Sequence, residues 1–216
     1  EQLTTALNKY AASDAVFTVD TGTPCIWSAR FLCATMGRSM IASFNHGSMA
    51  NAMPMAMGAQ KEYPDRQVIA LCGDGGLSML LGDLITIAQY KLPVKIVVYN
   101  NGCLDFIQLE MQAAGLIPWQ IDLHNPSFSA VADAVGIKGF LLDKSSQVDQ
   151  MVQTFLNYPG PALLDAHVDR DALALPPYIS VGQAADFSLS MMKQTFTGEI
   201  KQVWNTLAGN RKLFKP

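Results

Sequence analysis

The sequence predicts an α/β fold: a parallel sheet with helices on both faces, followed by a mainly helical C-terminal segment. Two observations predict it. Short apolar or β-branched runs alternate with helical patterns over most of the chain, and this alternation is typical of parallel sheets built from strand-helix-strand units. Roughly the last forty residues carry no run of that kind, so we expect no strand there.

The expected elements follow from these runs and from residues that favour helix starts. Ser127 and Ser145 stand where side-chain oxygens can cap a helix. We expect strands at 15–20, 40–43, 67–72, 94–100, 137–142 and 162–168, and helices near 23–35, 50–62, 77–90, 127–135 and 145–157. Pro176-Pro177 interrupts the pattern, so we place a boundary near Asp171 and predict two domains, 1–171 and 172–216.

Composition narrows the class of protein. The chain has 216 residues, of which 50% are apolar and 15% charged, so it can bury a sizeable core and disorder is not expected. Its net charge is −3 and its pI about 5.5, with no long basic run before the C-terminal segment. This balance argues against a nucleic-acid groove and favours a small-molecule partner.

The cysteines and the apolar runs exclude two further classes. Cys25, Cys33, Cys72 and Cys103 form no C-x-x-C pair, so neither a zinc site nor a disulfide framework is predicted, and buried thiols in a reducing cytoplasm are expected. No signal peptide is recognisable, and no apolar run reaches the roughly 18 residues that span a bilayer.

The segment 67–101 carries the strongest functional pattern. An apolar strand leads into Gly73-Asp74-Gly75-Gly76, a helix follows, and a second apolar strand ends in Asn100-Asn101. A right-handed crossover makes the two strands parallel, so Asp74 and Asn101 are expected to meet at the carboxyl edge of the sheet. Open α/β sheets bind their ligands at that edge.

These residue types suit a metal-bound diphosphate. A carboxylate and an amide oxygen are hard donors of the kind that Mg²⁺ prefers, and the Cys103 carbonyl is a candidate third ligand. Gly75 and Gly76 allow close approach of the backbone, and the following helix offers N–H groups and a positive dipole end. ATP and dinucleotide sites are disfavoured, since no G-K-[ST] is present and Ser78 replaces the third glycine of the dinucleotide motif.

The complete unit, G-D-G followed after about 25 residues by N-N, resembles the signature of thiamine-diphosphate-dependent enzymes. The resemblance implies the thiamine-diphosphate-binding fold, with Asp74, Asn101 and the Cys103 carbonyl as ligands of Mg²⁺. A chance Gly-Asp-Gly turn is the alternative. The length of the matching unit argues against it.

A second segment, Asn45-His46-Gly47-Ser48-Met49-Ala50-Asn51, resembles the aminopyrimidine clamp of the same family. The resemblance implies that the Gly47 carbonyl and the Met49 N–H bind the ring, with Ser48 between them, and that the Met49 side chain holds the cofactor bent. Bending would bring the amino group to the reacting carbon. The alternative is that Met49 fills the core, as methionines commonly do.

The stretch after the metal motif bears on the choice within the family. Its last part is expected to be helical, which puts Phe106 and Glu110 on one face, toward the cofactor. Phe followed four residues later by Glu is similar to pyruvate oxidases, whereas acetolactate synthases typically carry other residues there. Asp105 departs from the pattern, and Glu110 could equally be a surface carboxylate. The expected cofactor contacts in this stretch are Gly102, Cys103, Leu104, Asp105, Phe106 and Ile107, with Phe106, Glu110 and Met49 expected to act in catalysis.

From its start to about Phe196 the chain resembles the C-terminal cofactor-binding portion of bacterial quinone-dependent pyruvate oxidases. The resemblance implies oxidative decarboxylation of pyruvate to acetate and CO₂ with thiamine diphosphate, Mg²⁺ and FAD, and electron transfer to ubiquinone. It also implies a homotetrameric parent enzyme, and a chain that is inert alone because most of the FAD site lies on another domain. A related decarboxylase such as acetolactate synthase, or a cofactor-binding fragment without activity of its own, are the alternatives.

The C-terminal segment predicts contact with an anionic lipid surface. Phe196, Ile200, Val203, Trp204 and Leu207 fall on one helical stripe. Such a stripe with basic flanks is typical of an interfacial helix, and the related oxidases bind lipid through their C-terminus. We therefore expect a cytoplasmic protein, peripheral on the inner face of the membrane; the alternative is a helix packed on the parent enzyme. Residues 191–216 carry five basic residues, Lys193, Lys201, Arg211, Lys212 and Lys215, against Glu199, a net charge of +4.

Overall fold

The computed structural model describes residues 1–34, 37–172 and 180–210. The predicted break at Pro176-Pro177 and the basic residues Arg211, Lys212 and Lys215 lie outside these ranges. The described chain forms two compact units, residues 1–101 with 124–168, and 102–123 with the segment from 169 onward. The predicted domains, 1–171 and 172–216, stay a prediction. Within the described residues, no helix combines the length and the apolar character needed to cross a membrane.

The first unit is built on a six-stranded sheet in the order β2-β1-β3-β4-β6-β5, with every neighbouring pair parallel. The central strands are buried along nearly their whole length, as strands covered on both faces must be. All six predicted strands are confirmed. Their bounds are β1 Val16–Val19, β2 Ser39–Ala42, β3 Val68–Gly73, β4 Lys95–Asn100, β5 Lys138–Leu142 and β6 Ala162–His167.

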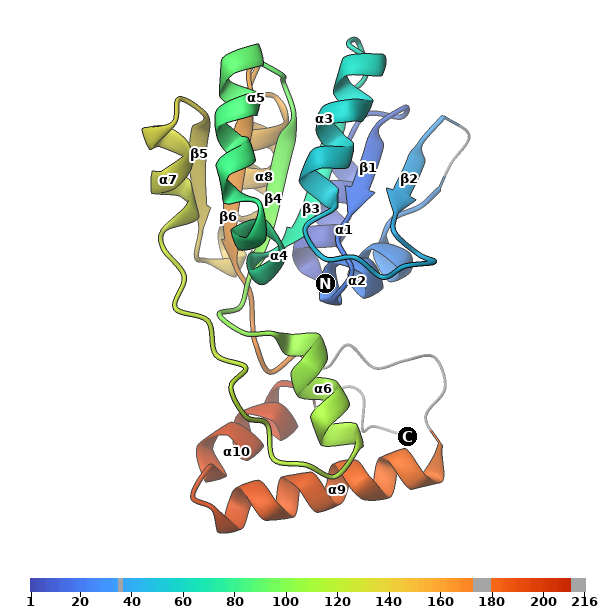
Figure 1. The fold of residues 1–216 in the computed structure, drawn as a ribbon, viewed down its shortest axis with the longest axis vertical. Helices are drawn as coiled ribbons and strands as arrows, with labels where there is room; N and C mark the ends of the chain where they lie inside the picture. The colour runs from blue at the N-terminus through green and yellow to red at the C-terminus, as the bar shows by residue number, and fades with distance from the viewer. Residues whose placement is uncertain (35–36, 173–179, 211–216) are drawn as a thin grey trace. The chain divides into compact units, whose positions relative to one another are not determined.

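Helices cover both faces of this sheet (Figure 1). Alternate strand residues such as Ala70, Cys72 and Val98 pack against helices α3, α4, α5 and α7 on one face. The intervening residues point to the other face, where α1 reaches β4 through a 2.8 Å hydrogen bond between Thr4 Oγ1 and the Tyr99 hydroxyl. The helices are α1 Gln2–Tyr10, α2 Thr23–Phe31, α3 Ala52–Glu62, α4 Asp74–Met79, α5 Leu84–Tyr90, α7 Phe128–Ala134 and α8 Val148–Leu156, with 3₁₀ turns η1 Leu81–Asp83 and η2 Ser145–Gln147.

Two helix predictions in this unit are wrong in detail. The helix expected over 77–90 is divided into α4, η1 and α5, because the backbone leaves helical geometry at Leu80 and Gly82 favours the break. Ser145 begins η2 and caps no helix. Ser127 is confirmed as a cap, since its side chain accepts a hydrogen bond from Ala130 N.

The second unit consists of α6 Asp105–Ala113, α9 Val181–Phe196 and α10 Ile200–Gly209, together with the extended segment that follows α6. α9 begins with a capping box formed by Ser180 and Gln183, and the Ser190 hydroxyl donates to the Leu116 carbonyl. Asn210 Nδ2 donates to the Asp171 carbonyl at 2.7 Å and ties the end of α10 to the unit.

The prediction of one continuous apolar stripe from Phe196 to Leu207 is wrong. α9 ends at Phe196, and α10 starts at Ile200. Gly198 lies between them with φ +97°, a conformation that only glycine adopts readily. The apolar residues of the stripe therefore belong to two helices.

Asp20 joins three elements of the first unit. Its side chain is 1% exposed at the end of β1, and Oδ1 accepts a 2.8 Å hydrogen bond from Ala52 N, the first residue of α3. Asn51, the residue at the N-cap of α3, makes no capping bond through its own side chain. A Cβ at Gly76 would collide with Asp20 Oδ2. Asp20 therefore caps α3 from a neighbouring strand and requires glycine at position 76.

Burial raises the pKa of Asp20 from 3.8 to about 6, against the opposing effect of backbone N–H groups of Ala52, Gly73 and Asn51. Because the folded state holds this proton more tightly than the unfolded chain, Asp20 contributes most stability below pH 3.8 and loses it as pH rises through 6. Asp20→Asn stays neutral. As pH rises over this range, the free energy of unfolding of the wild type should fall relative to that of Asp20→Asn, by up to about 3 kcal/mol.

Urea unfolding followed at intervals between pH 4 and 7 measures this difference. Asp14→Asn is the matched control, because Asp14 is exposed and its replacement should leave the wild-type pH profile intact. Parallel profiles for Asp20→Asn and wild type would contradict the assignment.

Candidate functional site

Polar residues collect at the carboxyl edge of the first unit's sheet. From β1 the chain moves outward to β2 and then returns to β3 on the other side of β1, so the strand order reverses between β1 and β3. Ligands of open α/β sheets bind at such a reversal. Asp20 follows β1 and Asp74 follows β3, which places both at this point.

Asp74 is held firmly at this edge. It is the first residue of α4 and 3% exposed. Its Oδ1 accepts from Gly75 N at 2.8 Å, and Oδ2 accepts from Asn125 Nδ2 at 2.7 Å. Both carboxylate oxygens thus have an assigned donor. The helix that begins here spans only Asp74–Met79, whereas the sequence predicted a longer helix, near 77–90. Its dipole is therefore weaker than expected, because fewer peptide units contribute to it.

Asn101 follows the end of β4, the strand next to β3. The pairing of Gly73 with Tyr99 brings the residues after both strands to the same edge, as expected for Asp74 and Asn101. Both belong to the first unit, whereas Cys103 belongs to the second. The set of three ligands therefore stays a prediction.

The backbone around Cys103 is fixed within the second unit. Leu104 N donates to the Ile121 carbonyl and Leu123 N to the Gly102 carbonyl, forming a short antiparallel bridge between Cys103 and Asp122. Gly102 has φ +66° at the turn that starts it. Arg170 Nη2 donates hydrogen bonds to Asp122 Oδ1 at 2.8 Å and to Cys103 Sγ at 3.3 Å, and so joins both sides of this bridge.

Burial of the Cys103 thiol disfavours its ionised form. Burial raises its pKa to about 11, although the Arg170 guanidinium acts in the opposite direction. The thiolate is the reactive form of cysteine. The prediction that Cys103 acts through its backbone carbonyl stays a prediction.

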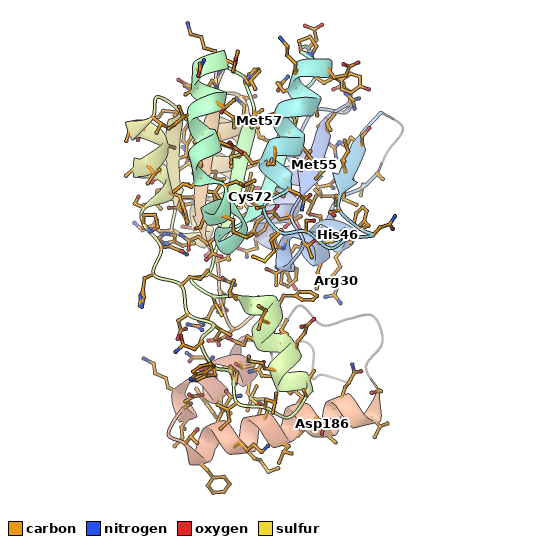
Figure 2. The ribbon with its side chains drawn as sticks, in the orientation of Figure 1. Arg30, His46, Met55, Met57, Cys72 and Asp186 are labelled. Carbon is orange, nitrogen blue, oxygen red and sulfur yellow. The ribbon has the colours of Figure 1, made fainter. Side chains whose placement is uncertain are left out.

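The proposed clamp lies on the loop between β2 and α3, where Figure 2 shows His46. Gly47 has φ +67° and Ala50 φ +61°, so the loop turns sharply on both sides of Ser48. Thr21 N donates to the Ser48 carbonyl at 3.3 Å, and the Asn51 side-chain amide donates to the same oxygen. These bonds connect the clamp to the loop after β1.

The methionines of this region differ in burial. Met49 is 36% exposed, whereas Met53 is 2% exposed and belongs to the core. Core packing, the alternative interpretation, therefore does not describe Met49. The wedge role stays a prediction.

Phe106 and Glu110 lie on α6, which confirms that this stretch is helical. Both are exposed, and the buried face of the helix instead carries Asp105, Gln108 and Gln112. The departure at Asp105 does not disturb the helix, which begins at that residue. Ile107 is also exposed, whereas Leu104 is partly buried.

Two residues of the edge network, Asn125 and Asp165, were not predicted. Asn125 Nδ2 also donates to Asn100 Oδ1 at 2.9 Å, and Asn100 Nδ2 donates to Asp165 Oδ1 at 2.9 Å. Two signals in the sequence could have indicated them. Asp165 is a lone carboxylate within an apolar strand, and Asn125 precedes a proline, which restricts its backbone to extended conformations.

The donor set fits a metal-bound diphosphate. Asp74 and Asn101 offer hard oxygen donors of the type that suits Mg²⁺. Gly75 and Gly76 follow Asp74 in the first turn of α4, and the lack of a Cβ at Gly76 leaves room for Asp20 Oδ2 and for the Ala50 backbone.

Comparison with known proteins places the chain in a family. Residues 20–166 match the model of the thiamine pyrophosphate enzyme, C-terminal TPP binding domain. A putative thiamine pyrophosphate-containing protein, YdaP, of Bacillus subtilis is 34% identical over 99% of this chain and 37% of its own length. The acetolactate synthase large subunit of Porphyra purpurea is 36% identical over 76% of this chain and 28% of its own. The pyruvate oxidase of Lactiplantibacillus plantarum is 33% identical over 79% of this chain and 29% of its own length.

The chain spans about a third of the length of these relatives. The match begins directly after β1 and ends within β6, and it includes the Gly73-Asp74-Gly75-Gly76 segment and Asn100-Asn101. The chain belongs to the family of thiamine-pyrophosphate-dependent enzymes and contains their C-terminal cofactor-binding domain.

Proposed function

We propose that the chain is the thiamine-diphosphate- and Mg²⁺-binding portion of a pyruvate:quinone oxidoreductase. The observation that carries the cofactor part is the Asp74 carboxylate, buried and hydrogen-bonded at the carboxyl edge beside the strand that ends in Asn100-Asn101. The chemistry supplied by bound thiamine diphosphate is that of an electron sink for decarboxylation of 2-oxo acids.

Each part of the site has a role in this proposal. Asp74, Asn101 and the Cys103 carbonyl hold Mg²⁺, and Gly75 and Gly76 let the backbone come close to the diphosphate. The clamp positions the aminopyrimidine through Gly47, Ser48 and Met49. The stretch 102–107 contributes further cofactor contacts.

The cofactor assignment is tested by titrating thiamine diphosphate into the chain by calorimetry, with Mg²⁺ and with EDTA. We expect heat only with Mg²⁺, and its loss in Asp74→Ala because the carboxylate ligand is gone. Asp65→Ala, at an exposed position beyond α3, should titrate like the wild type. Metal-independent heat, or unchanged titration of Asp74→Ala, would overturn the role of Asp74.

Oxidase activity is favoured over synthase activity by Phe106 and Glu110, which lie one turn apart on α6. We propose that pyruvate is the substrate, that FAD accepts the electrons mainly on a domain outside this chain, and that the quinone is reduced in turn. The second candidate is acetolactate synthase, since relatives with that name are as similar to the chain as the pyruvate oxidase is.

Anaerobic mixing of pyruvate with the full-length protein separates the two activities. An oxidase reduces its flavin and releases one acetate and one CO₂ for each flavin reduced. The absorbance of the oxidised flavin, near 450 nm, should therefore be almost completely lost. A synthase has no net redox step. Accumulation of acetolactate with the flavin still oxidised would contradict the oxidase.

We further propose that the C-terminal helices contact an anionic lipid surface on the cytoplasmic side of the membrane, and that the whole enzyme is a homotetramer. Ile200, Trp204 and Leu207 are exposed along α10, and Phe196 is 90% exposed at the end of α9. Lys201 lies on the same helix. Lys193 donates to the Gly115 carbonyl, so its ammonium group is held against the second unit while it keeps its positive charge.

Sedimentation with vesicles tests this contact. We expect the chain to bind vesicles that contain an anionic phospholipid, to bind neutral vesicles weakly, and to lose binding as salt is raised. Trp204→Ser should weaken binding several-fold because it removes an interfacial aromatic side chain. Trp119→Ser, at another exposed tryptophan, is the control. Equal binding by both variants would count against α10 as the contact.

A further inference from the structure

A continuous chain of side-chain hydrogen bonds crosses three strand ends of the first unit. It runs from Asp74 to Asn125 at 2.7 Å, from Asn125 to Asn100 at 2.9 Å, and from Asn100 to Asp165 at 2.9 Å. Asp165 Oδ2 in turn accepts from Phe128 N at 2.9 Å, at the start of α7. We call Asn125 and Asn100 the amide relay.

The hydrogen-bond donors and acceptors around the amide relay fix the orientation of its two side-chain amides. Asn125 Nδ2 faces two oxygens, Asp74 Oδ2 and Asn100 Oδ1, so the nitrogen of this amide must lie on that side. Asn100 then presents its own Nδ2 to Asp165. Each amide is therefore oriented by the next group, and the far end is fixed by a carboxylate that is fully buried.

The backbone of Asn125 is restricted as well. Pro126 follows it and disfavours helical geometry in the residue before it. The Asn125 side chain thus starts from a restricted backbone, and both hydrogens of its amide are used. The relay is a rigid support for Asp74, and it also separates the Asp74 and Asp165 carboxylates by two neutral groups.

We propose that Asn125 is a positioning residue for the metal: it holds the Asp74 carboxylate in the orientation that binds Mg²⁺. This inference rests on the proposed function. Groups that hydrogen-bond to a metal-ligating carboxylate fix its orientation, and their loss typically lowers metal affinity tenfold to a hundredfold. Asn125 acts through Asp74 and has no role assigned in the chemistry itself.

The test measures the Mg²⁺ concentration that gives half-maximal binding of thiamine diphosphate, by calorimetry on the full-length protein. We expect Asn125→Ala to raise this concentration about tenfold or more. The thermal midpoint in EDTA is measured in parallel, because a purely structural residue would change that midpoint and leave the Mg²⁺ requirement unaltered.

Asn210→Ala is the matched control. Asn210 is also an asparagine whose Nδ2 donates two hydrogen bonds, to the Asp171 and Thr206 carbonyls, and it lies in the second unit. We expect this variant to lower the thermal midpoint with no change in the Mg²⁺ requirement. Should Asn125→Ala fail to fold, Asn125→Leu keeps the branched shape of the side chain while removing both donors.

An unchanged Mg²⁺ requirement in a folded Asn125 variant would overturn the positioning role and leave the proposed function standing. Cofactor binding by the wild type that does not depend on Mg²⁺ would overturn the metal site itself, and the inference with it. A raised Mg²⁺ requirement in both Asn125→Ala and Asn210→Ala would attribute the effect to general destabilisation and would also reject the inference.

Discussion

The parallel pairing of β1, β3, β4 and β6 is the constraint on which the site depends. These strands are buried on both faces, so apolar side chains fill most of their length, and a polar residue within them, such as Asp165, is hydrogen-bonded. Parallel direction then sends all of the carboxyl ends to one edge. The edge therefore collects a carboxylate, an amide pair and a glycine turn from segments that are far apart in the sequence.

Buried carboxylates at this edge have a second, structural use. Asp20 accepts from the first N–H of α3, and Asp165 accepts from the first N–H of α7. In both cases a strand supplies the cap to a helix on its face. Fixing α3 in this way also fixes the loop before it, which holds Gly47 and Met49. The same interactions that stabilise the fold therefore set the shape of the site.

The second unit has a different physical character. Its helices bury polar side chains such as Gln108, Gln112 and Gln194 and leave large apolar ones exposed, including Phe196 and Trp204. Exposed apolar side chains of this size commonly mark surfaces that contact another molecule. The identity of that molecule follows from charge as well as from apolar area, which is why the position of the Lys193 ammonium group, hydrogen-bonded to the Gly115 carbonyl, matters to the lipid proposal.

The sequence alone determined the six strands, the fold class, the family resemblance, and the meeting of Asp74 and Asn101 at one edge. These follow from local periodicity and from the obligatory handedness of a parallel crossover. Only the tertiary structure decided that Asp20 caps α3, that Asn125 supports Asp74, and that Met49 stays out of the core. It also ended α9 at Phe196 and left Ser145 without a capping role. Contacts between residues tens of positions apart leave no periodic pattern in the chain, so no local rule could place them.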